Sequence, residues 1–157
     1  QGRLEEATGH YLKALEIKPG YAEAHYNFGN VLLRQRKVRK AMTAYEEALR
    51  HKPNFVEAHC NLGAVLLGQG TFREAIVHYS AALQTKPGFA EAHYNLGIAL
   101  LGQGSVEEAI YHYREALRID PKHRKARENL DALLQHVGSR NETGSRSADR
   151  RSRGRTR

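Results

Sequence analysis

The chain has 157 residues, long enough for one domain, and 40% of them are hydrophobic, which with a mean hydropathy of −0.67 is typical of a soluble globular protein. No apolar run approaches the roughly 18 residues needed to cross a bilayer, which excludes a membrane segment in this chain. The net charge of +8 lies mostly in residues 137–157, where seven arginines accompany two acidic residues, so the excess positive charge describes a tail more than a domain.

Four prolines lie 34 residues apart and divide the chain into units of equal length. A fixed period between about 20 and 50 residues indicates supersecondary units that cannot bury their apolar faces alone. Such units stack into an elongated body with a long exposed surface, not around a compact pocket. The repeat therefore favours binding over catalysis, and we expect no enzyme activity. The prolines are Pro19, Pro53, Pro87 and Pro121.

Residues 1–21 form only the second half of a unit, and we expect a single helix ending before Pro19. The chain starts inside this half-unit without methionine, so we interpret it as a piece of a longer protein. We expect that protein to be cytoplasmic. Because the helix lacks its partner, Leu4, Tyr11 and Leu15 are expected to present unburied apolar surface. We therefore expect self-association through this open N-terminal end.

Each complete unit is predicted to contain two antiparallel helices. In the second unit, apolar residues from Ala58 to Leu66 recur at helical spacing, and glycines at 68 and 70 interrupt the pattern. A second apolar stripe begins at Phe72 and ends before Pro87, because proline removes an amide donor and clashes within a helix. No stretch has the alternation of a strand. The complete units are 22–55, 56–89 and 90–123.

The turn between the helices of the first complete unit departs from this pattern. Arg36 replaces the glycine that closes the first helix in the other two units. A left-handed conformation costs a non-glycine residue on the order of 1 kcal/mol. We expect this turn to be the least stable of the array.

Residues 124–136 are predicted to form a capping helix with one apolar stripe, and residues 137–157 a disordered tail. The tail is rich in arginine, serine and glycine, a composition that binds polyanions without sequence readout. Nucleic-acid binding is therefore expected of the tail at most, and we consider it unlikely. The stripe of the capping helix consists of Ala126, Leu130, Leu133 and Leu134.

Nine histidines raise the question of a metal site, which their spacing argues against. Packed helices lie about 8–10 Å apart, whereas zinc needs nitrogen ligands about 2 Å from one centre. Single histidines repeated once per unit are therefore expected not to converge. With one cysteine, no phosphate loop and no nucleophile motif, we predict no metal, cofactor or catalytic residue. The two histidine series are His25, His59 and His93, and His10, His78 and His112.

The residue spacing within each unit resembles the tetratricopeptide repeat, which has an aromatic, Leu-Gly, a large residue, Ala, an aromatic and Pro in this order. The resemblance covers residues 1 to about 136, although histidine replaces the usual tryptophan. It implies an all-α, right-handed superhelical solenoid of antiparallel helix pairs with a C-terminal capping helix. It also implies a protein–protein interaction scaffold that binds an extended peptide in its concave groove. The motif of the second unit is His59, Leu62, Gly63, Leu66, Ala75, Tyr79 and Pro87.

One asparagine recurs in the same place of every unit and of the capping helix. Asparagine is a poor helix former, so each costs a few tenths of a kcal/mol unless it pairs. Its carboxamide has donors and an acceptor together and can hold a peptide backbone whatever the ligand's side chains are. Rungs about 10 Å apart would meet about every third residue of an extended ligand. The predicted peptide-binding residues are Asn27, Asn61, Asn95, Asn129, Tyr26, Tyr94, Asn30, Glu57, Glu91, Leu67 and Leu101.

This asparagine series is similar to the one in the tetratricopeptide region of O-linked N-acetylglucosamine transferase, where asparagines hold extended peptides. The resemblance leaves open a role as the recognition region of a glycosyltransferase whose catalytic domain lies outside this chain. Polyanion binding by the tail is another alternative. A structural alternative also remains, in which each asparagine bonds a neighbouring helix. If Asn61 and Asn95 grip a ligand, their replacement by alanine should weaken binding without lowering stability.

Overall fold

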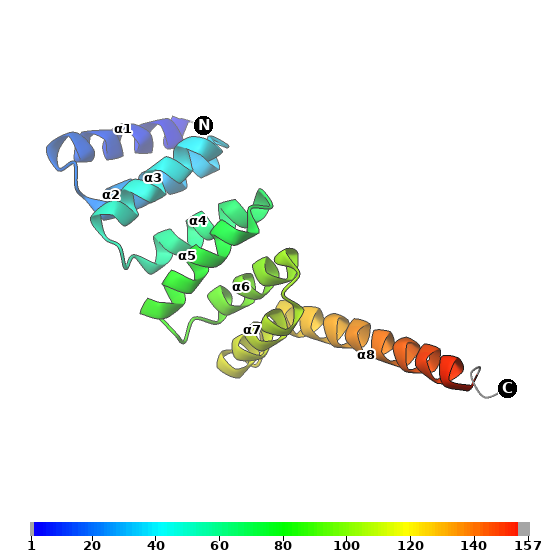
Figure 1. The fold of residues 1–157 in the computed structure, drawn as a ribbon. Coiled ribbons are helices and arrows are strands. Elements are labelled where there is room, and N and C mark those ends of the chain that lie inside the picture. The colour runs from blue at the N-terminus through cyan, green and yellow to red at the C-terminus, as the bar shows by residue number, and fades with distance from the viewer. Residues whose placement is uncertain (1, 154–157) are drawn as a thin grey trace.

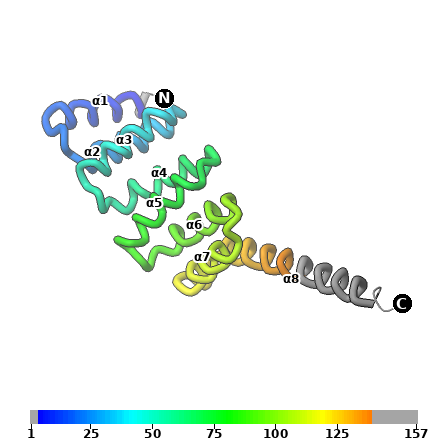
Figure 2. The backbone as a smooth tube through the Cα atoms, in the orientation of Figure 1, coloured from blue at the N-terminus to red at the C-terminus, as the bar shows by residue number. Residues whose placement is uncertain are grey.

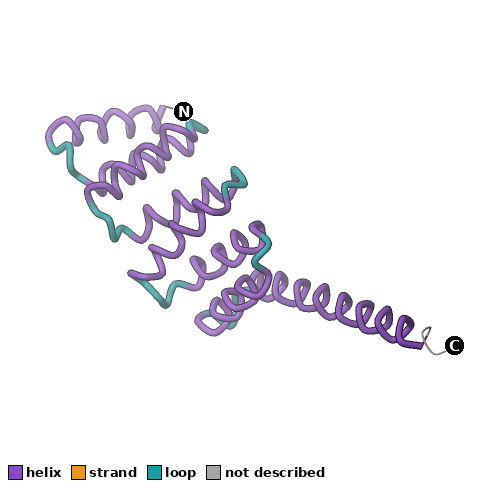
Figure 3. The backbone as a smooth tube through the Cα atoms, viewed as in Figure 1, coloured by secondary structure: helices purple, strands orange, loops and turns teal. Residues whose placement is uncertain are grey.

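The computed structural model describes the backbone of residues 2–153 and the side chains of residues 4–138. Within these residues all regular secondary structure is helical, and short turns join the helices (Figure 3). None of the described helices is long and apolar enough to cross a membrane. The expected all-α fold is confirmed. The helices are α1 (Gly2–Ile17), α2 (Ala22–Arg34), α3 (Val38–His51), α4 (Val56–Gly68), α5 (Phe72–Thr85), α6 (Ala90–Gln103), α7 (Val106–Ile119) and α8 (Arg124–Arg153).

The helices α2 and α3, α4 and α5, and α6 and α7 form three antiparallel pairs that follow one another along a solenoid (Figure 1). The chain advances from pair to pair without returning, with α1 at one end and α8 at the other (Figure 2). This arrangement confirms the solenoid expected from the 34-residue period, because each pair buries its apolar face against its neighbours.

A glycine on the first helix faces a tyrosine on the second helix of each pair. A Cβ atom at Gly97 would lie 2.7 Å from Cε1 of Tyr113, and one at Gly29 would lie 2.6 Å from Cε1 of Tyr45. Both tyrosines are 0% exposed, so their rings fill the space that the missing side chains leave. The Leu-Gly element of the motif is therefore a close helix–helix contact.

The turns inside the helix pairs have the backbone conformation that the sequence predicts. Gly70 and Gly104 have φ angles of 76° and 93°, and Arg36 at the equivalent place has a φ of 59°. Arg36 is the only non-glycine residue with a positive φ in the part of the chain that the structure describes. The left-handed arginine is thus confirmed.

Replacing Arg36 by glycine is expected to stabilise the array by up to about 1 kcal/mol, because the Cβ atom that disfavours a left-handed residue is removed. The greater freedom of glycine in the unfolded chain offsets part of this gain. Thermal unfolding measures the difference. Gly104→Ala is the matched control, with a loss of similar size expected. A lower midpoint for Arg36→Gly would contradict the prediction.

The leading helix α1 packs against α2, and it buries more of its apolar residues than the sequence suggests. Leu4, Tyr11 and Leu15 are each half-buried, so the expectation that they lie unburied is wrong. The side-chain amide of Gln35, directly after α2, donates to the backbone oxygen of Leu4 at 3.2 Å. The apolar residue that α1 leaves most exposed is Ile17, with 86% of its surface accessible.

The terminal helix α8 closes the core and then continues beyond it. Ala126, Leu130 and Leu133 are buried against the last pair, whereas Leu134 of the predicted stripe is 38% exposed. The helix runs to Arg153, so the expected helix end at residue 136 is wrong. No proline follows Pro121, and glycines cost a helix only about 1 kcal/mol each, so nothing in the sequence forces an end there. The predicted polyanion binding depends on side chains after residue 138, which lie outside the described ones. The predicted disorder of residues 154–157 also lies outside the described residues.

Candidate peptide-binding face

The four repeated asparagines lie on α2, α4, α6 and α8, and we call this side of the array the asparagine face. All four side chains are half-buried. On α4 the face also carries Glu57, which is exposed, and Leu67, which is half-buried; on α6 it carries Leu101, which is 37% exposed. Polar and apolar side chains of the predicted set are therefore both accessible to solvent.

Where the second pair packs on the first, three of the predicted residues bond one another or the buried Tyr45. The hydroxyl of Tyr45 donates to Oδ1 of Asn30 at 2.7 Å, and Nδ2 of Asn61 donates to the same oxygen at 2.8 Å. Nδ2 of Asn61 also lies 3.3 Å from the hydroxyl oxygen of Tyr26. This network joins α2, α3 and α4. At Asn61, the structural alternative of a bond to the neighbouring helix is therefore what the structure shows.

The second pair has no equivalent network, because Cys60 and Ala64 stand where the first pair has tyrosine and asparagine. The hydroxyl of Tyr79 is buried and has no hydrogen-bond partner among the described residues. Among the described residues, the amide of Asn95 makes one side-chain contact, 3.4 Å from its Nδ2 to Oε1 of Glu91 on its own helix. Asn95 therefore keeps most of its hydrogen-bonding capacity for another molecule.

The ends of the series differ again. Tyr94 is only 9% exposed and packs on the ring of His123 with the centroids 4.8 Å apart, so it is less accessible than the sequence suggests. Burial and the negative charge of Glu91 raise the pKa of Tyr94, whereas hydrogen bonding by Asn129 lowers it. Asn27 makes no side-chain hydrogen bond within residues 4–138.

The asparagine face is negatively charged near its middle. Burial, followed by the carboxylates of Glu57 and Glu91, raises the pKa of the Cys60 thiol to about 11, so the thiol is neutral at physiological pH. Glu91 pairs with His123 at 3.2 Å, but Glu57 has no ion pair within the side chains described here. This part of the face therefore carries two carboxylates, of which one is paired, with Lys86 as a nearby positive charge.

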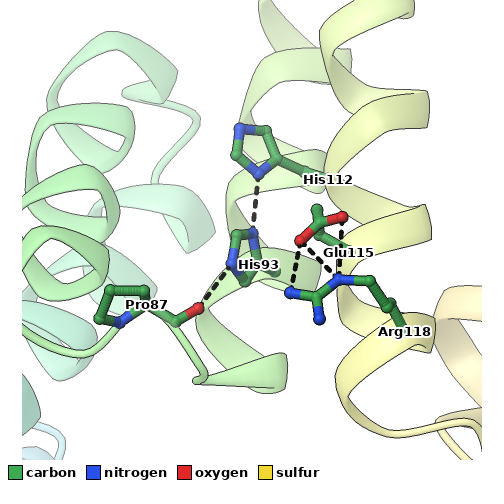
Figure 4. Close-up of polar contacts among 5 residues, drawn as sticks. All are labelled: Pro87, His93, His112, Glu115 and Arg118. Carbon is green, nitrogen blue, oxygen red and sulfur yellow. Dashed lines mark hydrogen bonds and ion pairs between the residues drawn. The ribbon is translucent and has the colours of Figure 1, made fainter.

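The two histidine series meet in two of the units, a contact that was not predicted from the sequence. Nδ1 of His93 lies 2.9 Å from Nδ1 of His112, and Nε2 of His93 lies 3.0 Å from the backbone oxygen of Pro87 (Figure 4). His59 and His78 repeat the arrangement at 3.0 Å. The expectation compared histidines of different units, but these pairs form across the two helices of one unit. The separation of 19 residues, which recurs between His59 and His78 and between His93 and His112, is the sequence feature that predicts these pairs.

The second-helix members of the two pairs, His78 and His112, favour the neutral state. Burial and the neighbouring His93 lower the pKa of His112 to about 4, and Glu115 opposes this shift only in part. Burial and His59 lower the pKa of His78 in the same way. Because the outer nitrogen of each first-helix histidine donates to a proline carbonyl, its Nδ1 is the acceptor of the pair. The pairs therefore link the two helices of a unit by a hydrogen bond.

Comparisons with known proteins agree with the fold. Models of the tetratricopeptide repeat match residues 26–88 and 60–124, and a further repeat model matches residues 1–36. No curated protein matches the chain in sequence. A crystal structure of MamA has a TM-score of 0.82 at 22% identity, over 92% of this chain and 84% of that chain.

Two other solved structures are similar. MamA from Desulfovibrio magneticus RS-1, from residue 41 to its end, gives a TM-score of 0.80 at 23% identity, over 99% of this chain and 89% of that one. The tetratricopeptide domain of Arabidopsis OM64 gives 0.70 at 23% identity, over 73% of this chain and 95% of that one. These likenesses concern the fold, and the repeat models match more than half of the chain. The chain therefore belongs to the tetratricopeptide repeat family of helical protein-interaction scaffolds.

Proposed function

We propose that the asparagine face holds an extended peptide segment of a partner protein, and that Asn95 is its main contact with the peptide backbone. The observation that carries the proposal is the difference between two equivalent residues. Asn61 already donates to Asn30 and Tyr26, whereas Asn95 makes one long contact with Glu91. An asparagine without a strong internal partner can exchange its water for a ligand backbone at little cost.

The surroundings of Asn95 support the same proposal. The nearby position 60 carries a neutral, half-buried cysteine in place of the tyrosine that bonds Asn61, so no side chain fills this place with a competing hydroxyl. Exposed Glu57 and Glu91 favour a segment with basic or neutral side chains. The regular spacing of the asparagines, similar to that of O-linked N-acetylglucosamine transferase, supports a second candidate, recognition for a glycosyltransferase domain on another part of the protein.

The experiment compares Asn95→Ala with Asn61→Ala. Peptides that the full chain selects from a display library of unstructured segments are titrated against both variants. Asn95→Ala is expected to lose about 0.5–1.5 kcal/mol of binding, or roughly 2- to 12-fold in affinity, with unchanged thermal stability. Asn61→Ala is expected to lower stability by about 1 kcal/mol, because Asn30 and Tyr26 lose their partner.

The two substitutions thus distinguish a residue that contacts the peptide from one that stabilises the fold. This replaces the expectation from the sequence that both variants lose ligand and keep their stability. A lower melting temperature for Asn95→Ala together with full peptide affinity would contradict the proposal. Failure of the library to yield any peptide that competes at the asparagine face would contradict it as well.

A further inference from the structure

The first helix pair carries a cluster of metal-ligating side chains that the other two pairs lack. His25 on α2 and Glu47 and His51 on α3 each offer one ligand atom, and these atoms all lie within 4.8 Å of one another. Glu47 and His51 are one helical turn apart, with Nε2 of His51 4.0 Å from Oε2 of Glu47. The rings of His25 and His51 are stacked, with centroids 5.7 Å apart and planes inclined by 16°. Two helices thus bring two imidazoles and one carboxylate together.

A hydrogen bond to the backbone fixes the tautomer of His25 that can bind a metal. Its Nε2 lies 2.7 Å from the backbone oxygen of Pro19, so this nitrogen carries the proton and Nδ1 keeps a free lone pair. Metal-binding histidines commonly donate their other N–H to a backbone carbonyl in this way, which fixes the tautomer and the ring. In the other two pairs, Nδ1 of the equivalent histidine is occupied by His78 or His112. The first pair has Ala44 at that position.

The absence of a histidine at position 44 leaves space beside the cluster. A cavity of about 550 Å³ is lined in part by His25, Ala44 and Glu47. On the other side, the ring of His51 abuts Gly20, where a Cβ atom would lie 3.2 Å from Nδ1 of the histidine. This packing leaves Nε2 of His51 on the side of Glu47. Solvent and an ion can therefore reach His25 and Glu47 from this cavity, and His51 is itself exposed.

Arg50 bonds one of the two carboxylate oxygens of Glu47. Nε of Arg50 donates to Oε2 of Glu47 at 3.0 Å, and Nη2 of Arg50 bonds the same oxygen. Oε2, which lies 4.0 Å from Nε2 of His51, has a second lone pair for a cation, and Oε1 makes no hydrogen bond to a described residue, while Arg50 orients the group.

We propose that His25, Glu47 and His51 bind a divalent late transition metal ion of the Zn²⁺ class, independently of peptide binding. Two nitrogens and one oxygen are a donor set that suits zinc, and water supplies the fourth position of the tetrahedron. Ligand atoms about 2.0–2.1 Å from the ion are about 3.3 Å apart, so the cluster contracts by roughly 1.5 Å at most. The side chains of His51 and Glu47 are 29% and 35% exposed, which gives them freedom to make this movement.

The test is a titration of the full chain with Zn²⁺ by calorimetry, and with Co²⁺ by visible absorption. We expect one saturable ion per chain, a tetrahedral Co²⁺ spectrum, and a higher melting temperature with zinc. The variants Glu47→Ala and His51→Thr introduce the residues that the second pair has at the equivalent positions, Ala81 and Thr85. Each is expected to weaken Zn²⁺ binding at least tenfold, while melting in the absence of zinc verifies that the array is folded.

The paired histidines elsewhere in the chain provide the control. The double variant His78→Ala and His112→Ala removes both pairs and introduces the residue that the first pair has at position 44. It should bind Zn²⁺ with the affinity of the native chain. Loss of binding in this double variant, with full binding in His51→Thr, would overturn the proposal. A native chain that binds no zinc stoichiometrically would overturn it too.

Discussion

Replacement of Gly97 by alanine is expected to destabilise the array by about 1–3 kcal/mol, although alanine is the better helix former by about 1 kcal/mol. The new Cβ atom would lie 2.7 Å from Cε1 and 2.8 Å from Cδ1 of Tyr113. Because this ring is fully buried between two helices, it cannot turn away without separating them. Urea unfolding of the variant and the native chain measures the difference in free energy of unfolding.

Gly68 at the end of α4 is the matched control, since a Cβ atom there would meet nothing within 4 Å. Gly68→Ala should therefore gain up to about 1 kcal/mol from helix propensity alone. The two substitutions are chemically identical and are expected to have opposite signs. Equal effects of the same sign would show that the close contact between Gly97 and Tyr113 does not limit the packing.

Acidification from pH 7.5 to pH 4.5 is expected to destabilise the chain strongly. The pKa of His112 is lowered to about 4 in the folded chain, and that of His78 is lowered as well, so the unfolded chain binds more protons below its ordinary histidine pKa of about 6.5. The stability from the neutral rings is complete above pH 6.5 and is lost as the pH falls toward the folded value. Each ring contributes a slope of at most about 1.4 kcal/mol per pH unit, which solvent screening reduces.

Thermal melts at a series of pH values test this expectation, with the double variant His78→Ala and His112→Ala as the comparison. Its stability should depend much less on pH between 6.5 and 4.5. Glu47 and Glu115 have lowered pKa values because of Arg50 and Arg118, so they stay ionised over most of this range and do not imitate the effect. The same slope in both proteins would refute the assignment to the histidine pairs.

The helix pairs and their turns could be predicted from the sequence because local rules determine them. The 34-residue period predicted that the helix pairs stack, and the prolines and glycines predicted where the helices end. The glycines at the equivalent turns predicted the left-handed conformation of Arg36. The length of α8 could not be predicted in this way. A composition of arginine, serine and glycine is typical of disorder, yet it contains no residue that excludes a helix.

The candidate site was only partly predictable. The four asparagines look equivalent in sequence, but whether each one bonds its neighbours depends on the residues one unit earlier. Asn61 meets Tyr26 and Asn30, whereas the corresponding neighbours of Asn95 are Cys60 and Ala64. The histidine cluster of the first pair was missed for a related reason. A pattern that repeats every 34 residues does not include His51, because the equivalent positions in the other two units are Thr85 and Ile119.

The hydrogen bonds of Asn61 also distinguish the two junctions between helix pairs. They cross from the first pair to the second, but within residues 4–138 no side-chain hydrogen bond crosses from the second pair to the third. Hydrogen bonds lose strength steeply when their geometry changes, whereas apolar surfaces tolerate small sliding movements. The junction between α4–α5 and α6–α7 is therefore held by packing, in which the ring of Phe72 on α5 lies against Gly102 on α6, whereas the first junction combines packing with directional bonds. In spectroscopic distance measurements between labels on the first two pairs, Asn61→Ala should therefore broaden the distribution relative to the native chain.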